Sequence, residues 1–270
     1  MADLAFNSTA FYFLVGLFGL CLGSFANVAA LRSLDGRDWI SAPSSCFACD
    51  RRLGWSENIP IYGFLRRGGK CACGERALPR RYVLVELAMA AALLAVFFRL
   101  DMMAALSFVP FVLLLGVIFL TDMDAFIIPD WASLGGLALG LALAAFGAPG
   151  LPALADAALG AGVGFALIYA INALYRAWRG HDGMGFGDVK LMAMFGAWLG
   201  AGALLPILFA ACFSGWVFGI VLLSMARLRA WAAARDAAKA MLPFCCFLVP
   251  MAFLWLLFAP QMRALLSVAG

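Results

Sequence analysis

Long uninterrupted apolar segments dominate this sequence and limit what it can fold into. Hydrophobic residues make up 66% of the 270 residues and charged residues 13%, and the mean hydropathy is +0.99, which excludes a soluble domain. A helix needs roughly 20 apolar residues to cross a bilayer, and continuous runs favour helices over the alternating strands of a barrel. We therefore predict an all-α polytopic membrane protein with about eight transmembrane helices, near residues 9–30, 82–99, 103–121, 131–147, 151–175, 189–203, 205–226 and 240–259.

Basic residues predict how these helices are oriented. With the loop after the first helix in the cytoplasm, seventeen Lys and Arg residues lie inside and only Arg99 and Arg263 lie outside, as expected for cytoplasmic loops. Both termini are then outside the cytoplasm, and the first helix, which no basic segment precedes, is expected to stay uncleaved. Because topology explains the net charge of +4, we expect contacts with membrane lipids and no nucleic acid.

The chain divides by composition into three parts. We expect a first transmembrane helix at 1–30, a cytoplasmic loop domain at 31–81 and a transmembrane core at 82–270. The loop domain is too short for an independent apolar core, so it needs a covalent or metal cross-link.

Two close cysteine pairs supply the candidates for that cross-link. In a reducing compartment, four thiolates favour a structural Zn²⁺ site over disulfides, and four unligated thiols are the alternative. The predicted ligands are Cys46, Cys49, Cys71 and Cys73. Cysteines within apolar runs are expected to be small core residues: Cys21, Cys212, Cys245 and Cys246.

The stretch Gly183–Lys190, with sequence GMGFGDVK, places an aspartate at the start of an apolar segment. Its glycines permit positive φ and let another backbone approach Asp188, and Lys190 adds a cation. An ionisable residue at a membrane boundary indicates a functional site. The alternative is that Asp188 only caps a helix that begins near Val189.

The connection after the third apolar segment carries Asp122, Asp124 and Asp130 and no basic residue. Asp130 follows Pro129 and is expected to cap the next helix, whereas Asp122 has no evident structural role. The topology places Asp122 and Asp188 at one membrane face, so they can meet. Two carboxylates within about 3–5 Å share one proton, and such a pair can activate water and polarise a carbonyl. This is the chemistry of aspartic peptide hydrolysis.

Other polar residues near helix ends have structural and functional interpretations. Ser24 and Asn27 either join helices by hydrogen bonds or line a polar pocket. Glu86 either pairs with the preceding arginines or faces a polar site. The Gly136-x-x-x-Gly140 and Gly160-x-x-x-Gly164 spacings predict close helix packing.

Several motifs together resemble a known family, the bacterial prepilin peptidases, which are GxGD intramembrane aspartyl proteases. Gly185–Lys190 resembles the family's G-x-G-D-x-K, and Asp122 with Pro129-Asp130 resembles its D-x-x-x-x-x-x-P-D. Further similar segments are Gly23–Val28 (GSFANV), Asn58–Pro60 (NIP) and Arg81–Glu86 (RYVLVE).

The resemblance implies a function and a set of site residues. Asp122 and Asp188 would be the catalytic pair, supported by Gly185, Gly187 and Lys190. The family removes the basic leader from prepilins and pseudopilins of type IV pilus and type II secretion systems, at the cytoplasmic face of the bacterial inner membrane.

Many members of the family then methylate the new amino terminus with S-adenosylmethionine. The methyl-transfer candidates are Gly23, Ser24, Asn27 and Glu86. Departures from the family pattern concern this second activity: Cys71 and Cys73 are one residue closer than usual, Val83 replaces a proline, and Leu31–Leu34 differs from the usual R-L-P.

Two other classes of protein fit the sequence. A proton-coupled transporter would also carry intramembrane carboxylates, although here Asp122 and Asp188 lie at one face. A pilus or secretion assembly protein that has lost catalysis is the second alternative. The sequence predicts no oligomeric state.

Overall fold

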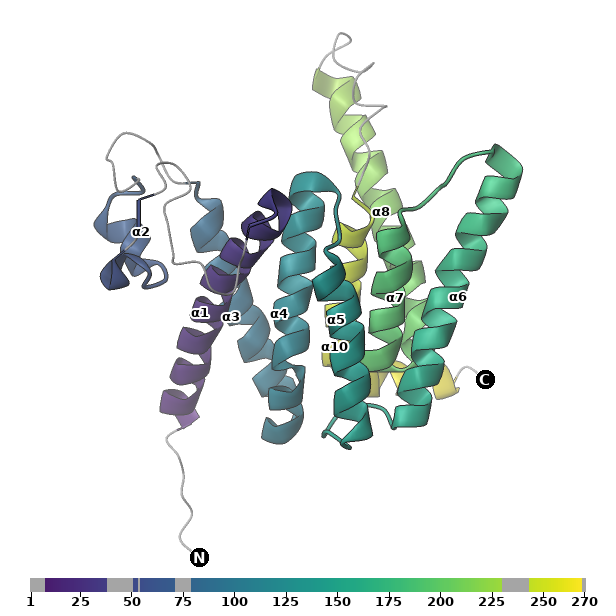
Figure 1. Ribbon diagram of the computed structural model, residues 1–270, viewed down its shortest axis with the longest axis horizontal. Helices are drawn as coiled ribbons and strands as arrows, with labels where there is room; N and C mark the ends of the chain where they lie inside the picture. The colour runs from purple at the N-terminus through teal and green to yellow at the C-terminus, as the bar shows by residue number, and fades with distance from the viewer. Residues whose placement is uncertain (1–7, 38–50, 53, 71–78, 230–242, 269–270) are drawn as a thin grey trace, which may run out of the picture. The chain divides into compact units, whose positions relative to one another are not determined.

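The chain is built from α-helices throughout the part that the computed structural model describes, which is residues 8–37, 51–52, 54–70, 79–229 and 243–268 (Figure 1). Each predicted apolar segment overlaps a helix within the described residues. In chain order the elements are α1 (Ser8–Asp35), η1 (Trp55–Glu57), α2 (Tyr62–Arg66), α3 (Arg81–Arg99), α4 (Met102–Ala125), α5 (Asp130–Ala145), α6 (Leu154–Arg179), α7 (Phe186–Leu199), α8 (Ala201–Arg229) and α10 (Cys245–Val268).

Five of these helices contain segments that are long and apolar enough to cross a membrane. They are Thr9–Asp35, Arg81–Arg99, Met102–Ala125, Leu154–Arg179 and Ala201–Val221. Asp130–Ala145 and Cys245–Phe258 are shorter apolar helices. This supports an all-helical polytopic membrane protein, and the count of eight spans remains a prediction.

The sixth and seventh predicted segments are separated at Gly200. Its φ of 81° lies in the left-handed region, which glycine adopts without steric cost, so α7 ends there and α8 starts at Ala201. Pro206 lies inside α8.

The chain forms two compact units, Met1–Thr121 and Asp122–Gly270. In the first unit α1 packs along α3 through glycines. A Cβ added at Gly19 would lie 2.6 Å from Ala90 Cα, and one at Gly23 would lie 2.6 Å from Glu86 Cα. Neither position has room for a side chain, so the two backbones approach closely.

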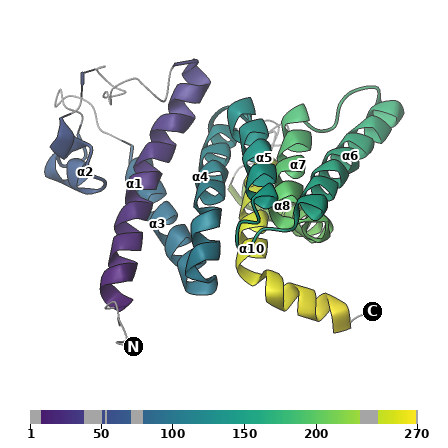
Figure 2. The same ribbon diagram turned by 60° about the horizontal axis from the view of Figure 1, so that its bottom comes forward.

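In the second unit α7 lies between α5 and α6, as both views show (Figures 1 and 2), and its residues from Leu191 to Leu199 are all buried. A Cβ at Gly160 would lie 2.3 Å from Gly196 O, and one at Gly164 would lie 2.3 Å from Met192 O. The close packing predicted for this glycine pair is therefore confirmed.

The other predicted glycine pair also lies against α7. Trp198 Nε1 donates a hydrogen bond of 2.8 Å to Gly136 O, and a Cβ at Gly140 would lie 2.6 Å from the same nitrogen. The α5 glycines thus make room for the indole of Trp198.

The prediction that the cysteines of apolar runs are core residues is correct for Cys245, which is buried. It is wrong for Cys21 and Cys212, which are exposed. Cys212 shares its face of α8 with exposed Phe209 and Phe213. An apolar residue in a membrane protein can face lipid instead of a core, so hydropathy alone does not predict burial.

Candidate active site

Asp122 and Asp188 come together in the second unit. Asp122 lies in the last turn of α4 and Asp188 in the first turn of α7, and their exposed fractions are only 5% and 9%. The two carboxylates are close enough to interact electrostatically. Burial of two acidic side chains beside each other is costly, and such an arrangement is typical of a functional site.

Asp188 lies within the first turn of α7 rather than at its N-cap. Gly185 occupies the N-cap position, with φ −69° and ψ 147°, and the helix begins at Phe186. The Asp188 N–H donates to Gly185 O over 3.1 Å. The capping alternative, which required a helix start near Val189, is wrong because α7 begins three residues earlier.

The glycines before Asp188, at positions 183, 185 and 187, do not use the positive φ that glycine permits. Two of them instead allow close approach. A Cβ at Gly183 would lie 2.6 Å from the Tyr175 ring, and one at Gly187 would lie 3.1 Å from the Ile128 side chain. Gly187 therefore lets the segment after α4 pack beside Asp188.

Asn172 of α6 holds the loop that leads into α7. Its side-chain oxygen accepts hydrogen bonds from the N–H groups of Gly183 (2.8 Å) and Met184 (3.1 Å). Its amide nitrogen donates to Asp182 Oδ1 over 3.2 Å, and Arg176 Nε lies 2.8 Å from the same oxygen. Sequence reasoning missed Asn172, for which the only signal was a polar residue inside an apolar run.

Lys190 forms an ion pair with Asp130 of α5, and its ammonium also lies 5.4 Å from the centre of the Phe186 ring. The prediction that Asp130 caps α5 is wrong. Pro129 is the N-cap residue and no side chain makes the cap hydrogen bond. Asp130 lies inside the first turn, and its carboxylate bonds to Lys190 instead.

The first turn of α10 lies against Asp122. The backbone N–H of Cys246 donates to Asp122 Oδ2 over 3.2 Å, and the Cys246 thiol also hydrogen-bonds to this carboxylate. Cys245 is buried near both Asp122 and Asp188. Sequence reasoning assigned both cysteines to the core and missed this contact.

The four methyl-transfer candidates lie together on the facing sides of α1 and α3, in the first unit. Gly23 lets α1 reach the backbone of Glu86, and the Ser24 hydroxyl hydrogen-bonds to the Glu86 carboxylate. Asn27 Nδ2 donates to Gly23 O (3.3 Å) and to Tyr82 O (3.5 Å). Asn27 Oδ1 is buried and accepts no hydrogen bond from the described residues, which leaves a buried acceptor available to a ligand.

A small folded segment, η1 with α2, supplies another partner of Glu86. The Ile61 N–H donates to Glu86 Oε2 over 2.7 Å, and Ile61 has a φ of 60°, which is unfavourable for a β-branched residue. Such local strain is typical of functional sites.

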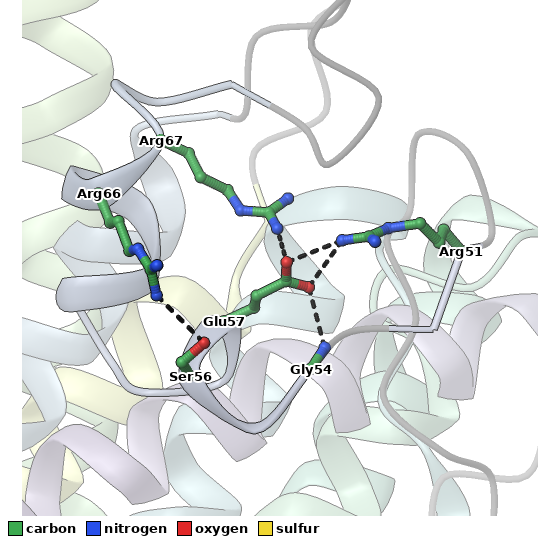
Figure 3. A network of polar contacts seen from close by, with 6 residues as sticks. All are labelled: Arg51, Gly54, Ser56, Glu57, Arg66 and Arg67. Atoms are coloured by element: carbon green, nitrogen blue, oxygen red, sulfur yellow. Dashed lines mark hydrogen bonds and ion pairs between the residues drawn. The ribbon is translucent and has the colours of Figure 1, made fainter.

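Glu57 stabilises this segment through a polar network (Figure 3). Its carboxylate accepts hydrogen bonds from Arg51 Nη2 (2.7 Å) and Gly54 N (2.9 Å) and pairs with Arg67. A Cβ at Gly63 would lie 2.2 Å from Glu57 O, so α2 packs directly on η1.

The four predicted zinc ligands, Cys46, Cys49, Cys71 and Cys73, lie outside the described residues. Within the described residues no group of three or more His, Cys, Asp or Glu side chains is arranged to hold a metal ion. The zinc site stays a prediction.

Comparison with known proteins agrees with these motifs. Residues 17–100 match the Bacterial Peptidase A24 N-terminal domain, and residues 109–220 match the Type IV leader peptidase family. A protein of Stutzerimonas stutzeri named prepilin leader peptidase/N-methyltransferase is 33% identical over 248 residues, which cover 82% of this chain and 84% of the relative. A protein of Pseudomonas aeruginosa with the same name is 32% identical over 249 residues, with the same coverage of 82% and 84%. No solved structure matches the chain. The chain belongs to the type IV leader peptidase family.

Proposed function

We propose that this protein is a membrane-embedded aspartyl endopeptidase that removes the leader peptide from prepilins and pseudopilins and then methylates the new amino terminus. The convergence of buried Asp122 and Asp188, in a chain of this family, carries the proposal. The relatives are named for both activities.

The aspartate pair has the chemistry that peptide hydrolysis needs. Two adjacent carboxylates bind one proton between them because both cannot ionise comfortably. The ionised member removes a proton from water as the water attacks the scissile carbonyl carbon, and the protonated member donates a hydrogen bond to the carbonyl oxygen. The leaving amine then takes a proton from the pair.

The elements around the pair support this assignment. Gly187 allows the Ile128 segment to lie against α7, and the Lys190–Asp130 ion pair joins α7 to α5. Asn172 fixes the loop before Gly185. We infer that Gly185, Gly187 and Lys190 act by positioning, and that Asp122 and Asp188 touch the substrate.

The membrane arrangement follows from the same proposal. The protein spans the bacterial inner membrane with eight helices, both termini lie outside the cytoplasm, and the aspartate pair lies at the cytoplasmic face, where the basic leader of a type IV pilus or type II secretion substrate reaches it. We also propose that the chain is organised into a first transmembrane helix (1–30), a cytoplasmic loop domain (31–81) and a transmembrane core (82–270). Carboxylates near the entrance favour a basic leader.

The α1–α3 residues fit a methyl donor. S-adenosylmethionine would supply an electrophilic methyl group and carries an ammonium that needs hydrogen-bond acceptors. Glu86 is a buried carboxylate, and Asn27 Oδ1 is a buried acceptor without a donor, so both would bind that ammonium or the pilin amine. Ser24 and the Ile61 N–H orient Glu86. Zn²⁺ bound by Cys46, Cys49, Cys71 and Cys73 would be structural.

Incubation of the purified full chain with a prepilin in lipid vesicles tests the proposal, with the product analysed by mass spectrometry. We expect loss of the leader, and gain of one methyl group when S-adenosylmethionine is added. Proton uptake into the vesicles without cleavage would indicate the transporter class. Binding of the prepilin without cleavage would indicate an inactive assembly protein. Either of these results would overturn the proposal.

A further inference from the structure

We propose that Cys246 is a positioning residue for Asp122, so that the first turn of α10 is part of the peptidase site. The inference rests on the proposed peptidase function. It assigns a role to a residue outside the motifs of α4 and α7.

Cys246 offers Asp122 two donors from one residue. The N–H reaches Asp122 Oδ2 over 3.2 Å, and the thiol hydrogen-bonds to the same carboxylate. The N–H also lies 3.2 Å from Pro243 O, as a three-centre hydrogen bond. Two donors from one residue restrict both the position and the rotation of a carboxylate more than one donor does.

The location of Cys246 in the helix explains why its N–H is available. α10 begins at Cys245, and the first four N–H groups of a helix have no acceptor within that helix. These groups and the helix dipole favour an anion at the N-terminus. Asp122 is that anion, supplied by a different helix.

The first turn of α10 is itself fixed, so it can hold another group in place. Leu248 is fully buried, and the Phe247 ring lies 5.7 Å from the Phe218 ring of α8. Cys245, also buried, lies near Asp122 and Asp188. Donors on a rigid element therefore hold the Asp122 carboxylate in one position.

A purely structural interpretation is that Asp122 only caps α10. In that case loss of the thiol would change stability and leave the turnover of folded enzyme unaltered. If the thiol positions Asp122 for attack, its loss lowers kcat with little change in KM, because the interaction matters in the transition state.

The test compares Cys246→Ala, Cys246→Ser and the matched control Cys212→Ala, an exposed cysteine of α8. Each is measured beside the unmodified chain for prepilin cleavage and for thermal unfolding. We expect Cys246→Ala to lower kcat about three- to tenfold with KM unchanged, Cys246→Ser to restore most of this rate through its hydroxyl donor, and Cys212→Ala to match the unmodified chain. Equal kcat for Cys246→Ala and the unmodified chain, or failure of serine to restore a reduced rate, would overturn the positioning role. No cleavage by the unmodified chain would overturn the proposed function instead.

Discussion

The side-chain oxygen of Asn172 accepts hydrogen bonds from the backbone N–H groups of Gly183, over 2.8 Å, and of the following residue Met184. This joins the end of α6 to the loop that precedes Asp188. We predict that Asn172→Ala releases the loop, because two N–H groups lose their acceptor at a cost of about 1–3 kcal/mol. We expect faster hydrogen exchange at the Gly183 and Met184 amides, measured by amide hydrogen exchange, and a slower rate of prepilin cleavage.

A control for Asn172→Ala is Asp182→Asn, which removes the charge of an exposed side chain and keeps a side-chain oxygen that can accept the hydrogen bond from the Asn172 amide. We expect that variant to retain slow amide exchange. Unchanged exchange at Gly183 in Asn172→Ala would show that other contacts hold the loop.

Contacts between α6 and α7 predict which glycines tolerate a methyl group. Gly160→Ala would place a Cβ 2.3 Å from Gly196 O, so we expect a loss of roughly 1–3 kcal/mol in the free energy of unfolding. Gly162→Ala, on the same helix with no neighbour within 4 Å of the new Cβ, is expected to be neutral or to stabilise by about 0.5–1 kcal/mol through helix propensity. Thermal unfolding in detergent measures both, and equal melting temperatures would refute close packing at Gly160.

A substitution at Glu86 is expected to affect methylation and leave leader cleavage unchanged. Glu86→Gln removes the charge and keeps the shape and an oxygen that accepts the Ile61 N–H. We expect methylation of the cleaved pilin to fall at least about tenfold, because a charged hydrogen bond is stronger than a neutral one, and S-adenosylmethionine binding by calorimetry to weaken. Leader cleavage by the same preparation serves as the control and should stay near the unmodified rate. Full methylation by Glu86→Gln would remove Glu86 from the methyl-transfer site.

Zinc content tests the predicted cysteine site. We expect one zinc per chain in the purified protein and its loss in a Cys46→Ser/Cys49→Ser double variant, because two thiolates cannot complete a tetrahedral structural site. Cys212→Ser, which changes a cysteine of an apolar helix, should retain the metal. Elemental analysis that finds no zinc in the unmodified chain would contradict the prediction.

Local patterns predicted helices in the apolar segments and singled out Asp122 and Asp188, which the structure brings together. Asp188 stands out because a glycine-rich turn precedes it and an apolar run follows it. The Gly160–Gly164 spacing predicted close packing because a helix places such residues on one face. Each of these two patterns involves only residues that are close together in the chain.

Contacts that depend on tertiary packing could not be predicted in this way. Cys246 meets Asp122 only because α10 returns to α4, and Ile61 meets Glu86 only because η1 and α2 fold against α3. The expected cap at Asp130 failed for a related reason, since the charge of Lys190 on another helix competes for that carboxylate.

The central claim is that Asp122 and Asp188 together cleave the leader, and single substitutions test it most directly. The rate of prepilin cleavage would be measured for Asp122→Asn and Asp188→Asn at equal amounts of folded protein. The control is Asp124→Asn, which changes an exposed carboxylate at the same end of α4. We predict a fall of at least about 10³-fold for each of the first two and a near-normal rate for Asp124→Asn. Cleavage at a near-normal rate by either Asp122→Asn or Asp188→Asn would contradict the claim.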